Sequence, residues 1–277
     1  MKCTNAMRLP VGSGALLMCL LALPQPTPGS DLANPAGMLS PGRISLGASY
    51  HVGGYTITNQ ELGCIMNRLH ARVDYGPLQY LNFGIDLGAS QMDVESTTVY
   101  SGDNDTVGTH YISFQGKFGF SGGVHLKAAT PRFFNDMMAV FGMASATMFT
   151  SSNDDGAYYS GIDGAGVVGL QFKVPKFGFV SAGAKLYYIH GSNKGYNSDK
   201  ESDYSNTDNV QGWLALDFLP PVKATAKGMP YFSAEITLVP GVKMGDEAVP
   251  IQGISFSVGI GWISPRLYGE DFENVEE

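Results

Sequence analysis

Cysteine and charged residues are both scarce in this sequence of 277 residues. Two of the three cysteines, Cys3 and Cys19, lie in an N-terminal segment with the pattern of an export signal, so its removal would leave Cys64 alone. A single cysteine excludes the intramolecular disulfides on which small exported domains often depend. Only 15% of the residues are charged, and the formal net charge of −8 argues against a nucleic-acid partner.

Long apolar runs are missing after the N-terminus. No stretch there offers the roughly 20 consecutive apolar residues that a membrane-spanning helix needs. No glycine-rich loop stands between a strand pattern and a helix pattern, so the sequence carries no nucleotide-binding signal, and we expect no cofactor. The mean hydropathy is −0.02 although 44% of the residues are hydrophobic, which indicates apolar residues dispersed among polar ones.

The first 30 residues have the pattern of a secretory signal peptide. Lys2 and Arg8 form a basic start, residues 11–23 form a short apolar core, and residues 24–30 are polar and contain proline. We expect cleavage between residues 22 and 31. The chain is therefore predicted to be exported.

Residues 111–127 alternate between apolar and polar side chains with a period of two. One parity carries Ile112, Phe114, Phe118, Phe120, Val124 and Leu126, interrupted by Gly116 and Gly122. The other parity carries Ser113, Gln115, Lys117, Gly119, Ser121, His125 and Lys127. Successive side chains of a strand point to opposite faces, so this segment is predicted to be a strand with one apolar and one polar face.

The same alternation recurs along the chain and predicts an all-β fold. The predicted strands are residues 43–52, 68–75, 79–92, 109–128, 137–150, 159–174, 177–190, 210–219, 230–239 and 254–262. Segment 137–150 is apolar on both faces, and its length, its glycine and its neighbours favour a strand over a helix.

Short turns and longer polar loops alternate between these strands. Residues 75–78 and 174–177 are tight turns with Gly or Pro, and 130–136 and 220–229 are longer but also contain proline. The remaining connections, 53–67, 93–108, 151–158, 191–209 and 240–250, are polar and mostly acidic. This pattern predicts a transmembrane antiparallel up-and-down β-barrel of about ten strands, with eight or twelve as alternatives, and both chain ends on the short-turn rim.

Residues 43–262 resemble bacterial outer-membrane β-barrel proteins, a broad superfamily. The resemblance rests on the alternating pattern and on segments such as YLNFGIDLG and ISFSVGIGW. The resemblance implies a signal peptide at 1–30, a periplasmic segment at 31–42, a barrel at 43–264 and an acidic tail at 265–277. It also implies an outer-membrane location in a Gram-negative-type envelope, contact with lipid and the assembly machinery, and a monomeric state. Such proteins usually end in an aromatic residue, whereas this chain continues past Trp262 to Glu277.

The polar parity carries charged residues that we expect to face the lumen. This predicted lumen charge network consists of Arg43, Arg72, Asp74, Asp86, Lys117, Lys127, Asp163, Lys173, Lys185, Asp217 and Glu235. Buried charges need partners. Candidate pairs are Arg72 with Asp86, Lys117 with Asp74, and Lys185 with Asp163 or Asp217. Side chains are expected to fill much of so narrow a barrel, although an open diffusion pore stays an alternative.

The apolar parity is expected to face lipid. Representative lipid-facing residues are Phe83, Ile85, Phe114, Phe118, Leu170, Leu186, Leu216, Ile236, Phe256 and Val258. If the two faces were reversed, these rows would line the cavity of a soluble lipid-binding barrel, which stays an alternative.

Acidic loop clusters are the weak candidates for a metal site. Asp103 with Asp105, and Asp154 with Asp155, offer the oxygen ligands that Ca²⁺ or Mg²⁺ prefers, but neither cluster has EF-hand spacing. Acidic loops also serve solubility, so we expect no metal.

Histidine and acidic residues near the outer rim are the candidates for catalysis. His190 with Asp93 and Glu95 could act as an acid–base group only if the fold brings them within hydrogen-bond reach. His70 and His125 lie on the inward parity and are expected to make hydrogen bonds in the lumen. No catalytic residue is predicted.

The leading prediction is an integral outer-membrane barrel, largely filled by side chains, with a structural, adhesive or minor transport role and no enzymatic activity. A narrow, porin-like small-solute channel, a soluble lipid-binding barrel and an outer-membrane enzyme are the alternatives. The sequence does not identify an external ligand.

Overall fold

The computed structural model describes residues 39, 41–57, 62–100, 109–175, 177–194, 201–206, 210–219, 228–239 and 253–264. The expected signal segment 1–30 and tail 265–277 lie outside these residues. The strands are β1 (Arg43–Ile57), β2 (Leu62–Leu78), β3 (Leu81–Tyr100), β4 (Thr109–Gln115), β5 (Lys117–Ala129), β6 (Met138–Ser152), β7 (Tyr158–Val174), β8 (Gly178–Lys194), β9 (Glu201–Ser205), β10 (Val210–Phe218), β11 (Met229–Leu238) and β12 (Ile254–Ile263). The described part of the chain contains no helix long and apolar enough to cross a membrane.

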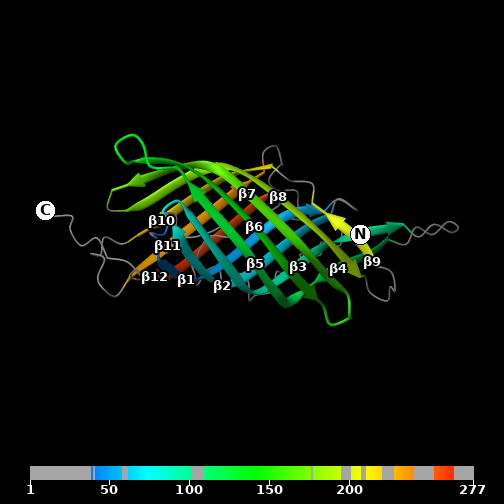
Figure 1. Ribbon diagram of the computed structural model, residues 1–277. Coiled ribbons are helices and arrows are strands. Elements are labelled where there is room, and N and C mark those ends of the chain that lie inside the picture. Colours follow the sequence, from blue (N-terminus) through cyan, green and yellow to red (C-terminus); the bar gives the residue numbers. More distant parts are fainter. Residues whose placement is uncertain are drawn as a thin grey trace, which may run out of the picture.

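The strands form one closed antiparallel barrel (Figure 1). β1 pairs with both β2 and β12, which closes the sheet. β4 and β5 are two parts of one wall strand, since both pair with β3 and only Gly116 separates them. β9 is an additional segment beside the outer part of β8, whose other part pairs with β10. The wall therefore has 10 strands, the predicted number.

The two rims of the barrel differ. Residues 79–80, 130–137 and 175–177 connect strands at one rim, which we call the turn rim. At the other rim, the loop rim, β3, β4 and β9 project beyond the neighbouring strands, on the right of Figure 1. Because the strands run up and down, short connections at one rim and long ones at the other follow from the alternation of turns and loops in the sequence.

Four predicted loops at the loop rim are partly strand, and in 151–158 this concerns only its two ends. β1 continues to Ile57 and β2 begins at Leu62, and the two stay paired from Gly54 with Ile65 to Ile57 with Leu62. β3 continues to residue 100, β8 continues to residue 194, and β9 follows it. Backbone pairing does not require an apolar outward face, so these segments escape a search for alternating apolar residues. Predicted loop 240–250 lies outside the described residues.

The outward face of the barrel is apolar. Large hydrophobic side chains exposed there include Leu69, Val73, Phe83, Ile85, Leu87, Val124, Leu126, Val168, Leu170, Leu186, Leu214, Leu216 and Phe256. Charged residues on the opposite parity, such as Asp86 and Lys185, are buried. Because the apolar rows point away from the barrel axis, the alternative of a soluble barrel with these rows lining its cavity is wrong.

A β-bulge in β5 interrupts the long alternation of residues 111–127. The pairing of β5 with β6 shifts register between Phe118 and Ser121. Phe114 and Gly116 are buried before the bulge, and Ser121 and His125 are buried after it, so the inward parity changes from even to odd. A bulge adds one residue to a strand and so moves all following side chains to the other face. The sequence shows glycines at this point but no break in the pattern.

Candidate functional site

The interior of the barrel has two chemically different regions. A group of charged side chains from β2, β3 and β5 fills one region, and a large apolar and aromatic group extends from the loop rim down to Phe141 near the turn rim. We call the group Arg72, Asp74, Asp86 and His125 the ionic cluster. We call the following buried group the apolar plug: Tyr55, Ile57, Cys64, Met66, Met92, Val94, Phe114, Phe141, Met143, Phe149, Ala157, Tyr159, Ala165, Val167, Tyr187, Ile189, Tyr204, Trp213 and Ala215.

The ionic cluster joins three adjacent strands. Arg72 of β2 and Asp86 of β3 are direct cross-strand neighbours, and Arg72 Nε donates to Asp86 Oδ1 over 2.6 Å. His125 of β5 lies beside them, with Nδ1 2.8 Å from Asp86 Oδ2 and Nε2 2.5 Å from Asp74 Oδ1. All four residues are buried. Of the pairs expected from the sequence, Arg72 with Asp86 is present.

Both ring nitrogens of His125 face carboxylate oxygens. A neutral imidazole has one N–H and can donate to only one of them. The group of His125, Asp74 and Asp86 therefore holds one further proton, either on the imidazole or on a carboxyl. With Arg72 beside Asp86, each buried charge in this cluster has an opposite charge or a hydrogen bond next to it, as burial requires.

Gly84 makes room for the ring of His125. In the sheet it lies between Asp74 of β2 and His125 of β5, directly paired with each. A Cβ added to Gly84 would collide with the imidazole and with the backbone oxygen of Val73. The absent side chain lets the ring cross β3 and reach the carboxylate two strands away.

A second ion pair spans the lumen between distant strands. Arg68 of β2 pairs with Asp163 of β7, and β3, β5 and β6 lie between them in the wall. The guanidinium also lies 2.6 Å from the sulfur of Met66 and 5.4 Å from the ring centre of Phe149. Arg68 therefore stands where the charged region meets the apolar plug. The predicted network omitted Arg68, although its place on the inward parity of β2 could have indicated it.

The remaining residues of the predicted network are placed as follows. Lys185 faces Glu235 over 3.7 Å, not Asp163 or Asp217 as expected. Lys127 and Asp217 are buried, and the Lys127 ammonium lies 5.8 Å from the ring of Phe141. Arg43 is half-buried near the turn rim and donates to the backbone oxygen of Ser264 over 3.5 Å.

Two lysines assigned to the lumen lie outside it, so those predictions are wrong. Lys117 pairs with Asp154 instead of Asp74 at the loop rim, and both side chains are exposed. The bulge in β5 moves Lys117 to the outer face. Lys173 pairs with Asp136 over 2.8 Å, because β7 extends past the turn rim where the inward parity faces solvent.

Most of the expected lipid-facing residues lie on the outer surface. Phe83, Ile85, Phe118, Leu170, Leu186, Leu216 and Phe256 are exposed, and Ile236 is half-exposed. Two assignments are wrong. Phe114 belongs to the apolar plug because of the bulge. Val258 keeps the outward parity but is only 7% exposed, because it lies between Tyr50 and Ala234 and neighbouring side chains cover it.

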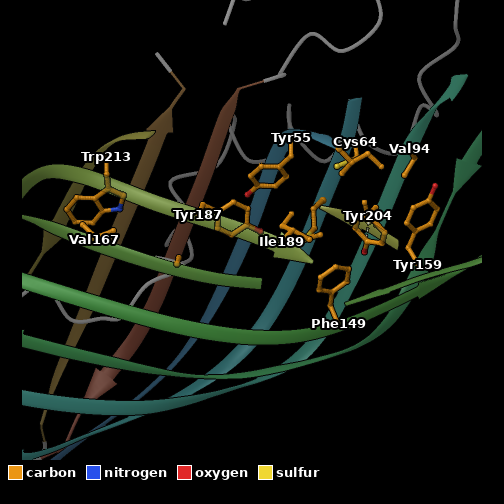
Figure 2. Packing of buried hydrophobic residues seen from close by; sticks show 14 of the residues in the cluster. Tyr55, Cys64, Val94, Phe149, Tyr159, Val167, Tyr187, Ile189, Tyr204 and Trp213 are labelled. Carbon is orange, nitrogen blue, oxygen red and sulfur yellow. Dashed lines mark hydrogen bonds between the residues drawn. The ribbon is translucent and has the colours of Figure 1, made fainter. Parts of the chain in front are cut away.

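The apolar plug is built around aromatic pairs. Tyr55 stacks on Tyr187 at 4.8 Å between ring centres, and Tyr159 lies 4.7 Å from Phe114 and 5.4 Å from Tyr204. Figure 2 shows Tyr55, Tyr159, Tyr187 and Tyr204 reaching from different strands into the same interior. Sequence reasoning expected a polar lumen throughout and missed the plug. The apolar residues on both faces of segment 137–150, which include Phe141 and Met143, were the available signal.

β9 completes the wall beside the plug. Asn206, directly after β9, forms an isolated bridge with Ile57 at the end of β1. Its side chain also extends the ladder of β8, accepting from Ile189 N over 2.8 Å and donating to Tyr187 O over 3.2 Å. Asn206 is buried. The side-chain amide of Asn206 thus makes the hydrogen bonds that a backbone peptide group would otherwise make, at the point where the pairing of β8 passes from β10 to β9.

The weak metal candidates do not form a site in the part of the chain that the structure describes. Asp103 and Asp105 lie outside it, and Asp154 is engaged with Lys117. Asp155 is exposed, and its backbone N–H donates to the side chain of Asn153. Among the described residues, no group of three or more His, Cys, Asp or Glu side chains could hold a metal ion.

The candidate acid–base residues lie on strands that are not neighbours. His190 of β8 is exposed and stacks on Tyr188 at 6.5 Å. Asp93 of β3 accepts from Gly116 N over 2.9 Å. The side chain of Glu95 is not among those described. His70 hydrogen-bonds with Ser121 over 2.8 Å inside the lumen, so it and His125 are hydrogen-bonded within the barrel interior.

A ten-strand antiparallel barrel with exposed apolar rows outside and buried charges inside has the architecture of a transmembrane β-barrel. The expected resemblance to outer-membrane β-barrels is thereby confirmed at the level of the fold.

Comparisons with known proteins add little beyond the fold. No family model and no curated protein matches the chain. Among solved structures it is similar to the translocator domain of the autotransporter NalP from Neisseria meningitidis, with 11% identity over 91% of this chain and 92% of that one and a TM-score of 0.42. It is also similar to the CymD monoaromatic hydrocarbon channel (11% identity, 82% and 89% covered, TM-score 0.29) and to a TodX deltaS2S3 mutant monoaromatic hydrocarbon channel (9%, 80% and 88%, TM-score 0.26). These likenesses are too loose to carry an argument about function.

Proposed function

We propose that this protein is an integral outer-membrane β-barrel whose lumen is blocked by side chains and whose role is structural or adhesive. The apolar outer face suits lipid, and the export signal expected at residues 1–30 suits passage to the outer membrane. The projecting strands at the loop rim and the acidic connections there would form the surface presented outside the cell.

The blocked interior carries this proposal. The Arg68–Asp163 pair crosses the lumen, and both side chains are almost fully buried, 2% and 3% exposed. The apolar plug lies against it, through Met66 and Phe149, and extends to the loop rim. Hydrophobic constrictions close channels by excluding water, so an ion pair next to an apolar plug is a poor path for solutes.

Planar-bilayer recording of the refolded full-length mature chain tests the proposal. We expect no steady conductance at moderate voltage, and a gel shift between unboiled and boiled samples to show that the barrel is folded. A steady conductance from heat-shifting protein would contradict the blocked lumen and favour the small-solute channel. The absence of any gel shift would contradict the closed barrel itself.

The enzyme alternative has a separate test. Because His190 and Asp93 lie on the outward faces of β8 and β3, with three wall strands between them, we propose that the barrel has no rim-located hydrolase activity. Incubation with peptide and lipid-ester substrates is expected to release no product above that of the His190→Ala variant.

A further inference from the structure

The turn between β5 and β6 exposes a group of apolar side chains. Residues 130–137 form this turn, which stands out from the turn rim on the left of Figure 1. Phe134 at its tip is 72% exposed, Met137 is 47% exposed and Phe133 is 37% exposed. Single exposed hydrophobic residues are ordinary on proteins, whereas this eight-residue turn exposes three, and the rings of Phe133 and Phe134 lie 5.2 Å apart.

The backbone of this tip is in an unusual conformation. Phe134, Asn135 and Asp136 have φ values of 50°, 55° and 63°, three consecutive non-glycine residues in the left-handed region. Asn and Asp tolerate this region, but a bulky residue such as Phe rarely adopts it. Strained backbone of this kind persists only where the surroundings hold it, and it gathers at functional positions.

The turn is held on both sides. Phe133 and Met138 exchange two backbone hydrogen bonds of 2.8 and 3.1 Å at its base. Arg132 reaches back, donates to Gln171 over 2.8 Å and lies 4.5 Å from the ring centre of Phe179. These contacts fix the base of the turn, so the exposed tip is a firm projection of the barrel wall.

A second set of contacts ties the tip to β7. Lys173 binds the carboxylate of Asp136 over 2.8 Å, and its backbone N–H donates to Met137 O over 2.8 Å. The charge of Asp136 at the tip is thereby compensated by Lys173, which leaves an apolar projection.

The surroundings of the turn identify lipid as its partner. The exposed outer-face residues Val140 and Phe172 follow directly, with Met138 paired to Phe172 across β6 and β7, so the tip continues the apolar outer surface. Because Lys173 compensates the charge of Asp136, the tip presents its apolar side chains without an unpaired acid to repel anionic lipid headgroups. We propose that Phe133, Phe134 and Met137 insert into the membrane interface at the turn rim, an inference that rests on the proposed outer-membrane barrel.

Position-specific fluorescence tests the proposal in the full mature chain. In a Cys64→Ala background, an environment-sensitive fluorophore is attached at Phe134→Cys, at Leu186→Cys on the apolar outer face, and at Asp155→Cys in the loop-rim turn. Each protein is folded into two sets of vesicles of phosphatidylethanolamine and phosphatidylglycerol, in which some lipids carry bromine either near the headgroup end or near the middle of the acyl chains. A gel shift on heating checks that each variant is folded.

The expected pattern separates the two hypotheses. A probe at 134 should lose roughly half of its fluorescence to the lipid brominated near the headgroup end, as a group about 5–10 Å into the interface would, and should be shielded from aqueous iodide. The probe at 155 should be quenched by iodide and should keep its fluorescence in brominated lipid. A probe at 134 that is as open to iodide as the one at 155, while 186 is quenched by lipid, overturns the insertion and leaves a periplasmic protein as the partner of the turn. If 186 is not quenched either, the membrane barrel itself is wrong.

Discussion

The ion pair that crosses the lumen gives a test of how the interior is stabilised. Arg68 and Asp163 are 2% and 3% exposed, so removing one partner leaves the other charge buried without its counterion. Such a change costs about 3–5 kcal/mol, whereas replacing both partners by apolar residues is often neutral. We expect Arg68→Met and Asp163→Val each to lower the free energy of unfolding by about 3–5 kcal/mol. The double variant should recover most of that loss.

Urea unfolding in detergent micelles, followed by the fluorescence of Trp213 and Trp262, measures all four proteins of this double-mutant cycle. The exposed pair of Lys173 and Asp136 is the matched control, with side chains 47% and 64% exposed. Surface pairs contribute about 0–1 kcal/mol, so the corresponding cycle at the turn rim should show almost no coupling.

One result would refute this reasoning. If the double variant loses the sum of the two single losses, Arg68 and Asp163 do not compensate each other, and the lumen would have to hold water that solvates each charge separately. The same variants should still show no conductance, because the apolar plug is unchanged. A conductance that appears only in the double variant would assign the closure to the ion pair and not to the plug.

Three further predictions concern single positions. Asn206→Ala should lower the urea midpoint, since each buried backbone group of β8 left unpaired costs about 1–3 kcal/mol, and Asn206→Asp, which buries a carboxylate oxygen against Tyr187 O, should lose no less. Gly84→Ala should destabilise the barrel by about 1–3 kcal/mol through collision with the imidazole of the ionic cluster, whereas Gly166→Ala, where the nearest atom to an added Cβ is 3.9 Å away, should change the midpoint little. The hydrogen bond from Lys173 lowers the pKa of Asp136, so this small contribution to stability is present above the ordinary carboxyl value of about 3.9 and is lost as the pH falls through the lower folded value. In the Lys173→Gln variant, the pKa of Asp136 measured by NMR titration should move towards its ordinary value. An unchanged pKa would contradict the pairing.

The strand number and the two rims could be predicted because each rests on a local pattern. Alternation with a period of two is visible within one strand, and Gly and Pro mark the turns without knowledge of their surroundings. The direct pair of Arg72 and Asp86 could be anticipated because both lie on the inward parity of strands joined by a short turn. Such a turn limits the possible registers.

The arrangement inside the lumen could not be predicted, because it depends on relations between distant strands. The bulge after Phe118 reverses the direction of every earlier side chain in the wall strand formed by β4 and β5. The alternation of apolar and polar residues in the sequence nevertheless continues through it. The partner of Asp163 is set by the barrel as a whole, since three wall strands lie between it and Arg68. The alternation along a strand predicts that a side chain faces the lumen, but it does not predict which other inward side chain it contacts.

The ionic cluster and the apolar plug contribute to the barrel in different physical ways. Near the turn rim, hydrogen bonds between β2, β3 and β5 fix these strands relative to one another, because each polar group is satisfied in only one register. Near the loop rim, stacked rings exclude water without favouring any one ion. A solute crossing the barrel would therefore have to break paired charges and also displace an apolar plug. Since the two costs arise from different chemistry, no single substitution in either group is expected to open the barrel.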